Sequence, residues 1–221
     1  TNAPSEDAKD RRGRSLRRQA ITDMAYIDGK LYIAGLSNEE FASNLRRLDF
    51  PFNKKMQASS LEIYHAAHGR FETHAPIRTF IPYNLKSEPY ILASYTCTPL
   101  VTFPIQKLEA GGHVKGKTVG EFGAGNRPLD MVAYRNDGKD FVLIANSNRT
   151  LMKFDPQDII GAKSLTEPVH QRYGTAGIEY ISIAQIGVLQ LADYNDSNVV
   201  VLQRDINSGS LNLRTLPKRR L

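Results

Sequence analysis

Two stretches of the sequence, "MAYIDGKLYIAGLS" (24–37) and "VAYRNDGKDFVLIANS" (132–147), share one layout. In each, a strand-like segment containing Ala-Tyr leads into an Asp-Gly turn, and a second apolar segment follows and reaches an alanine. Apolar alternation on both sides of an Asp-Gly turn predicts a β-hairpin. The two stretches therefore indicate a hairpin unit that recurs along the chain.

Two more stretches follow the same plan, "IPYNLKSEPYILASY" (81–95) and "ISIAQIGVLQLADY" (181–194). The alanines that end the four second strands are spaced about 50 residues apart: Ala34, Ala93, Ala145 and Ala192. After each hairpin we expect a third apolar strand, at 45–50, 100–105, 151–156 and 199–205. A more polar fourth strand is expected at 61–65, 113–119, 167–173 and 211–216.

Four antiparallel strands per unit, repeated at this period, are typical of the blades of a β-propeller. The sequence therefore predicts an all-β fold. Its expected parts are a polar, basic arm (1–20), four blades (about 21–65, 77–119, 128–173 and 178–216) and a basic tail (218–221).

The pattern over residues 20–216 resembles that of the β-propeller repeat proteins. "GNRPLDMVAY" (125–134) is loosely similar to the start of an innermost strand in lactonase and NHL-type propellers. The chain has no tryptophan, which excludes the Trp-Asp repeat family. Most propellers have more than four blades, so the resemblance favours part of a seven- or eight-bladed propeller, completed by another chain or by further sequence. A closed four-bladed ring is the alternative, but a chain with one cysteine could not close that ring with an internal disulfide.

The net charge of +6 comes entirely from the two ends of the chain. Between them, positive and negative side chains balance, so no folded basic face is expected to bind nucleic acid. Basic ends are typical of solvated tails or of surfaces that bind an acidic partner. No apolar run reaches the ~20 residues that a membrane span requires. The absence of an initiator methionine favours a processed protein, periplasmic or secreted.

Candidate site residues gather at one end of the predicted blades. In an up-and-down blade, the turn from second to third strand lies at the same end as the link to the next blade. That end is expected to hold His65, His68, His74, Cys97, Asn126, Arg127, Asn146, Asp193 and Asp196.

The stretch "YHAAHGRFETH" (64–74) holds three of the five histidines. Imidazoles on a loop can bind a metal ion or a haem iron, so His65, His68 and His74, with Cys97 from the neighbouring unit, form the candidate metal site. Glu72 could orient a histidine or complete the site. The alternative is a solvent-facing hairpin whose histidines bond backbone carbonyls.

Arg127, Asn126 and Asn146 are the candidates for binding an anionic cofactor or substrate. The alternative for Arg127 is an ion pair with Asp130 or Asp23 that clamps neighbouring blades. Two functions follow: a binding or assembly module that docks with a partner chain and presents this loop face, or a metal- or cofactor-dependent oxidoreductase or hydrolase. Fold analogy does not choose between them, because propellers host both.

Overall fold

A computed structural model describes residues 2–53, 55–85, 88–171 and 173–221. It confirms the all-β prediction: four sheets of mainly antiparallel strands account for the fold, and the described residues contain one short α-helix, α1 (Pro156–Gly161). Thr1 and the expected turn at Lys86-Ser87 lie outside the described residues. In the described part of the chain, no helix is long and apolar enough to cross a membrane.

The first two sheets follow the predicted plan closely. The first consists of β1 (Asp23–Ile27), β2 (Lys30–Leu36), β3 (Ser43–Asp49), β4 (Gln57–His65) and β5 (Arg70–Glu72), in that order. The second consists of β6 (Ile77–Leu85), β7 (Glu88–Tyr95), β8 (Pro99–Pro104) and β10 (Lys117–Glu121), with β14 (Ala176–Gly177) at its edge. Short 3-10 helices lie between and beyond the strands: η1 (Arg17–Gln19), η2 (Ala66–His68), η3 (Ile105–Lys107) and η4 (Lys218–Arg220).

The third and fourth sheets correct the predicted strand assignment. The third contains β11 (Pro128–Asn136), β12 (Lys139–Asn146), β13 (Leu151–Phe154) and β15 (Ile181–Ile183). The fourth contains β16 (Val188–Asn195), β17 (Asn198–Arg204) and β18 (Leu211–Pro217).

The segment 167–173 was expected to be the fourth strand of the third unit, but its described residues contain no strand. β15 takes that place, so the third sheet extends beyond the expected boundary at 173. The segment 181–194 is consequently not a hairpin: its first half completes the third sheet, and its second half is the first strand of the fourth. Apolar alternation identifies a strand but not its partner. The pattern therefore paired the two halves of segment 181–194 with each other, although they belong to different sheets.

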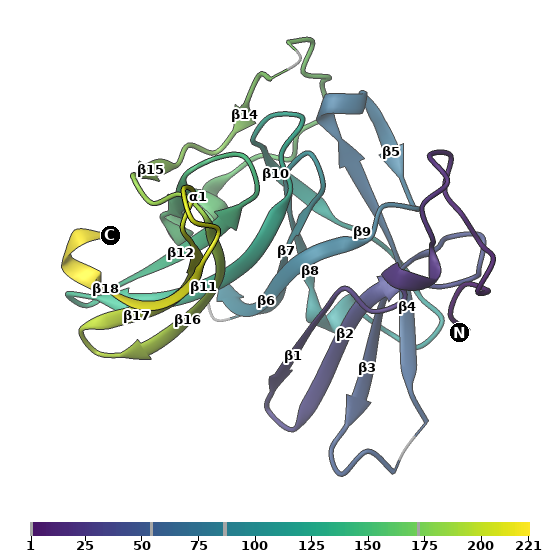
Figure 1. Ribbon diagram of the computed structural model, residues 1–221. Helices are drawn as coiled ribbons and strands as arrows, with labels where there is room; N and C mark the ends of the chain where they lie inside the picture. The colour runs from purple at the N-terminus through teal and green to yellow at the C-terminus, as the bar shows by residue number, and fades with distance from the viewer. Residues whose placement is uncertain (1, 54, 86–87, 172) are drawn as a thin grey trace.

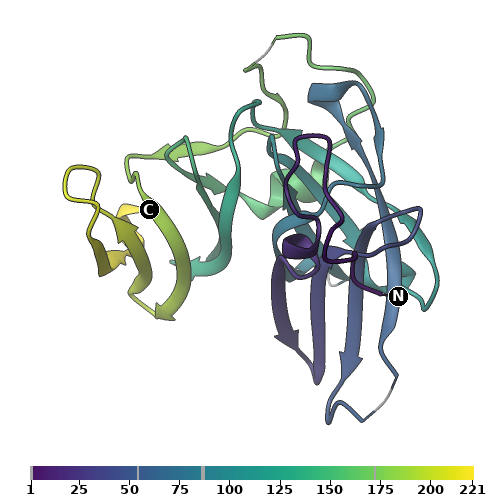
Figure 2. The ribbon, with the colours of Figure 1, turned by 45° about the vertical axis from the view of Figure 1, so that its right-hand side comes forward.

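The four sheets follow one another as a fan, with the first and fourth at opposite ends of the molecule (Figures 1 and 2). The inner strands lie in the order β1, β6, β11, β16, each packed beside the next. Among the described residues, no sheet closes on itself.

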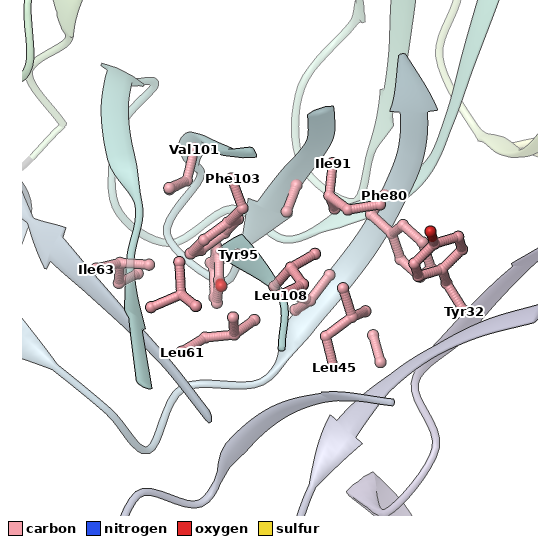
Figure 3. Close-up of a cluster of buried hydrophobic side chains, with 14 residues drawn as sticks. Tyr32, Leu45, Leu61, Ile63, Phe80, Ile91, Tyr95, Val101, Phe103 and Leu108 are labelled. Carbon is pink, nitrogen blue, oxygen red and sulfur yellow. The ribbon is translucent and has the colours of Figure 1, made fainter. Parts of the chain in front are cut away.

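A separate apolar core fills each of the three gaps between successive sheets. Neighbouring residues of a strand point to opposite faces of their sheet, so a central strand supplies two cores. In β7, Ile91 (Figure 3) and Ala93 enter the core between the first and second sheets, whereas Leu92 enters the next one. The outward faces of the first and fourth sheets lie beyond these three cores.

Two aspartates tie neighbouring inner strands together by the same device. The Asp23 carboxylate accepts hydrogen bonds from its neighbour's N–H and, at 2.8 Å, from the Phe80 N–H on β6. The Asp130 carboxylate does the same toward the Leu191 N–H on β16, at 2.7 Å. Burial raises the pKa of both carboxyl groups above the ordinary value. We call these two contacts the aspartate clasps.

One strand crosses from the second unit to the first. β9 (His113–Lys115) belongs by sequence to the connection between β8 and β10, but it pairs in parallel with β4. Glu62 on β4 reinforces this pairing through the His113 Nε2 atom at 3.0 Å and the Lys115 Nζ atom at 2.8 Å.

The N-terminal arm packs on the first sheet. The Arg46 guanidinium donates hydrogen bonds to the carbonyl of Ala20, at 2.7 Å, and to that of Leu36. A Cβ atom at Gly35 would lie 2.1 Å from the Ala20 carbonyl oxygen, so this close approach of arm and sheet requires glycine.

Candidate functional site

The histidine-rich segment forms the end of a β-hairpin. β4 ends at His65, the 3-10 helix η2 follows, and Gly69 takes a left-handed conformation (φ 63°) that turns the chain back into β5. The register pairs His65 with Arg70 and Ile63 with Glu72. This geometry places the side chains of His65, His68 and Glu72 on one side of the hairpin end.

Glu72 holds both imidazoles at once. Its two oxygens lie 2.9 Å from His65 Nδ1 and 2.8 Å from His68 Nδ1. Burial acts to raise the pKa of Glu72, but the hydrogen bonds and charges of the two histidines outweigh it and hold that pKa at about 2. The hairpin of the alternative hypothesis is therefore present, yet the histidines bond a carboxylate instead of backbone carbonyls.

The two imidazoles differ in exposure. The His65 side chain is 3% exposed and that of His68 is 44% exposed, with ring centroids 3.9 Å apart. His65 Nε2 is buried and has no hydrogen-bond partner. A carboxylate on Nδ1 directs Nε2 outward as a potential ligand, which is the usual arrangement behind metal-binding histidines.

Cys97 lies in the turn that follows β7. Both Cys97 (φ 65°) and Thr98 (φ 68°) are left-handed, a conformation that costs non-glycine residues roughly 1–3 kcal/mol each. Hydrogen bonds hold the turn: the Cys97 N–H donates to the Asn126 carbonyl, and the Thr98 hydroxyl accepts from the Phe122 N–H. The surrounding structure thus imposes the strained turn that positions the thiol.

These segments bring three of the four predicted metal ligands together. One nitrogen of His65, one of His68 and the Cys97 sulfur all lie within 4.8 Å of one another. Tetrahedral bonds of 2.0–2.3 Å would set ligand atoms about 3.3–3.8 Å apart, so a bound ion would require shifts of roughly 1 Å. The fourth predicted ligand, His74, is exposed, bonds the Thr73 hydroxyl and does not join this cluster.

A second carboxyl group lies against the cluster from the second sheet. Glu121, at the end of β10, is fully buried, and its Oε2 atom lies 3.8 Å from His65 Nε2. Its Oε1 atom has no partner, while Oε2 accepts a hydrogen bond from the Ala67 N–H. Burial, and to a lesser degree the charge of Glu72, raise the pKa of Glu121 to about 8.

Asn126 and Asn146 support the cysteine turn. Their amides bond each other at 2.8 Å, and both asparagines are buried. Asn126 also accepts from the Asn148 N–H through its side chain and from the Cys97 N–H through its carbonyl. Because these amides are engaged inside the protein, their geometry favours a positioning role over the predicted direct contact with a cofactor.

Arg127 is exposed, and its backbone pairs with Ser147. The expected clamp to Asp130 or Asp23 is absent among the described residues, because both carboxylates bind backbone N–H groups as the aspartate clasps.

Asp193 and Asp196 do not lie near the histidine cluster. The fourth sheet starts one strand later than predicted, so the turn that carries them joins first and second strands. They line a polar groove of about 350 Å³ beside the Asp137 turn, where Lys218 Nζ binds Asp193 at 2.8 Å. Their predicted place on the histidine end of the sheets is therefore wrong.

The sequence interpretation missed two polar residues at this end, Glu121 and Arg78. Glu121 ends the fourth strand of its unit, just as His65 ends the fourth strand of the first unit. Comparing equivalent strand ends would have found it. Arg78 lies at an irregularity in the register of β6, and no pattern in the sequence distinguishes it.

No family model matches this chain, and no curated protein matches it significantly.

Proposed function

We propose that this chain is a β-propeller segment whose loop end binds a transition-metal ion through His65, His68 and Cys97. The propeller arrangement is supported by the succession of four sheets, by inner strands that lie side by side in chain order, and by the repeated aspartate clasps. The lactonase and NHL-type resemblance rests on the same pattern and stays a proposal.

The observation that carries the metal proposal is the convergence of three ligand atoms from two sheets. A single carboxylate, Glu72, orients both imidazoles by their Nδ1 atoms. The Nε2 atom of His65 is buried without a partner, which is costly unless a ligand satisfies it. A bound cation would supply that partner.

The chemistry of the ligands favours zinc or copper. Thiolate and imidazole together suit these ions, whereas oxygen ligands suit magnesium and calcium. Three protein ligands leave a fourth position for Glu121, water or a substrate, the arrangement found in catalytic zinc sites. A haem fits less well, because His65 Nε2 faces the Glu121 carboxyl at 3.8 Å and leaves no room for a macrocycle on that side.

Elemental analysis of purified protein tests this proposal. We expect about one equivalent of zinc or copper per chain, and loss of most of it in His68→Ala and Cys97→Ser. His74→Ala is the matched control, since His74 is an exposed histidine of the same segment outside the cluster. Cobalt(II) loading adds a spectroscopic check, because a thiolate-to-cobalt absorption band should appear in the wild type and vanish in Cys97→Ser. Metal-free protein that takes up no zinc, copper or cobalt would contradict the proposal.

A second proposed function is docking with further sheets of another chain. The outward face of the first sheet exposes Met24 and Tyr26, and that of the fourth exposes Leu211 and Leu213, which is 76% exposed. Apolar side chains gathered at both ends of the fan are what missing propeller blades would cover. Light scattering should therefore show self-association of the isolated chain, reduced by Leu213→Ser. A stable 24.7 kDa monomer at high concentration would contradict docking.

A further inference from the structure

Arg78 lies at the same end of the second sheet as the Cys97 turn. β6 has an irregular register between Ile77 and Thr79, and Arg78 is the residue inside that bulge. Ile77 pairs with Tyr95, two residues before Cys97. Bulges redirect a side chain out of the regular alternation and occur often beside binding sites.

The guanidinium of Arg78 has no protein partner among the residues that the structure describes. Its Nε atom is buried without a hydrogen bond, and the described residues offer it no ion pair. The equivalent bulge of the next inner strand, β11, contains Leu129, which packs against the third core. An apolar side chain therefore satisfies the same backbone geometry, and the bulge itself does not require arginine.

The charges of two more arginines act on this position. Arg127 directly precedes β11, the strand packed beside β6, and its side chain is exposed. Arg14, on the N-terminal arm, acts on Arg78 through its charge, and its own guanidinium pairs with Asp10 at 2.7 Å. Burial lowers the pKa of Arg78, and the nearby charges of Arg127 and Arg14 lower it further. Arg14 is balanced by Asp10, whereas Arg78 and Arg127 have no ion pair with a carboxylate among the described residues.

We propose that Arg78 and Arg127 together bind an oxyanion, a carboxylate or a phosphate, on the rim beside Cys97. Guanidinium groups suit this role because their planar N–H donors match two oxygens of such an anion. The anion would provide the missing partner of the Arg78 Nε atom. This site goes beyond the metal proposal and does not depend on a bound metal.

Calorimetric titration of metal-free protein tests the site. Chelator-treated protein is titrated with inorganic phosphate, and separately with succinate, at constant ionic strength with chloride as the reference anion. The two titrations distinguish a phosphate site from a carboxylate site. We expect one of them to bind in a 1:1 ratio, and Arg78→Gln and Arg127→Gln each to weaken it about tenfold or more.

Arg135→Gln is the matched control, because Arg135 is an exposed residue at the other end of β11. It makes the same change in net charge, and we expect its affinity to stay within about twofold of the wild type. A loss as large as that of Arg78→Gln would mean that net charge alone attracts the anion, and would overturn the proposal. Failure of both phosphate and succinate to bind would overturn it as well.

Thermal melting separates anion binding from a structural role. In buffer without phosphate or succinate, we expect Arg78→Gln to melt no lower than the wild type, because a half-buried charge without an ion pair has been removed. A clear decrease would show that Arg78 stabilises the fold, against the proposal. Cys97→Ser should lose metal but keep the anion, so failure of either proposal is seen independently of the other.

Discussion

The junction between the first and second sheets and the junction between the third and fourth are built by the same rules and carry different side chains. Each has an apolar core between facing sheets and one aspartate clasp between inner strands. The first–second junction adds buried aromatic residues, the crossing strand β9 and the histidine cluster. The third–fourth junction is mainly aliphatic, and its outer sheet has three strands.

Equivalent positions show where the two junctions diverge. The fourth strands of the first three sheets end in His65, Glu121 and Ile183. The bulges of β6 and β11 hold Arg78 and Leu129. Where an apolar residue serves the fold in one unit, a polar residue at the equivalent position of another unit calls for another explanation. Here the polar residues lie at the same end of the sheets as Cys97.

The largest expected difference concerns the cores. Phe103 is fully buried between the first and second sheets, and Val201 occupies the junction of the third and fourth. Phe103→Ala should lower the free energy of unfolding by about 3–5 kcal/mol. Val201→Ala should lower it by about 2 kcal/mol, because it removes less buried hydrocarbon. Urea unfolding measures both losses. Equal losses would contradict the expectation that the first–second junction contributes more to the free energy of unfolding than the third–fourth junction.

The aspartate clasps should behave alike, since their geometry is the same. Asp23→Ala and Asp130→Ala each leave two backbone N–H groups without their acceptor. We expect each substitution to lower the free energy of unfolding by about 2 kcal/mol. Asp196→Ala, at an exposed turn, is the control and should change it by less than about 0.5 kcal/mol. Losses at the two clasps that differ by more than about 1 kcal/mol would break the equivalence.

The clasps also predict a pH dependence. Both carboxyl groups have a raised pKa in the folded chain, so the folded state keeps protons that the unfolded state releases. Their contribution to stability is therefore greatest below the ordinary pKa and falls as pH rises through the folded pKa values. Urea unfolding at successive pH values should show this fall in the wild type. The Asp23→Ala, Asp130→Ala double variant should show a smaller fall, because, of the described carboxyl groups with a raised pKa, only Glu121 still contributes to it. An unchanged profile would contradict the assignment.

The smallest expected effect is at the bulge of β6. Arg78→Leu copies the residue of the sister bulge and should change the free energy of unfolding by no more than about 0.5 kcal/mol, or raise it slightly. The same variant should abolish phosphate or succinate binding. A loss of several kcal/mol would mean that arginine is needed for the fold of this unit and would remove the contrast with Leu129.

Much of the fold was predictable from the sequence. The Asp-Gly turns at 28–29 and 137–138 and the alternation around them predict β1–β2 and β11–β12 correctly, because these turns join strands that are neighbours in the chain. β15 was misassigned because its partner, β13, lies about 30 residues away and the described part of the intervening segment contains no long strand. Pairing at that distance depends on tertiary packing, which local patterns do not encode.

The candidate site was predictable in part. Assigning loops to one end of the sheets brought His65, His68 and Cys97 together before any coordinates, and the structure places them within 4.8 Å of one another. His74 was included only because it is close in sequence. Glu121 and Arg78 were missed because each is marked by a single buried atom without a partner, Oε1 and Nε respectively, and such burial depends on neighbours from other sheets.

The crossing strand β9 has a mechanical consequence. Its backbone is covalently part of the second unit and hydrogen-bonded to the first, so separating these two sheets would require peeling β9 from β4. The pairing of β9 with β4 restrains relative sliding of His65 and Cys97. Within the described residues, no strand crosses between the third and fourth sheets in this way. If the fan flexes, the hinge should lie toward its C-terminal half, and the spacing of the thiol and the imidazoles should survive the motion.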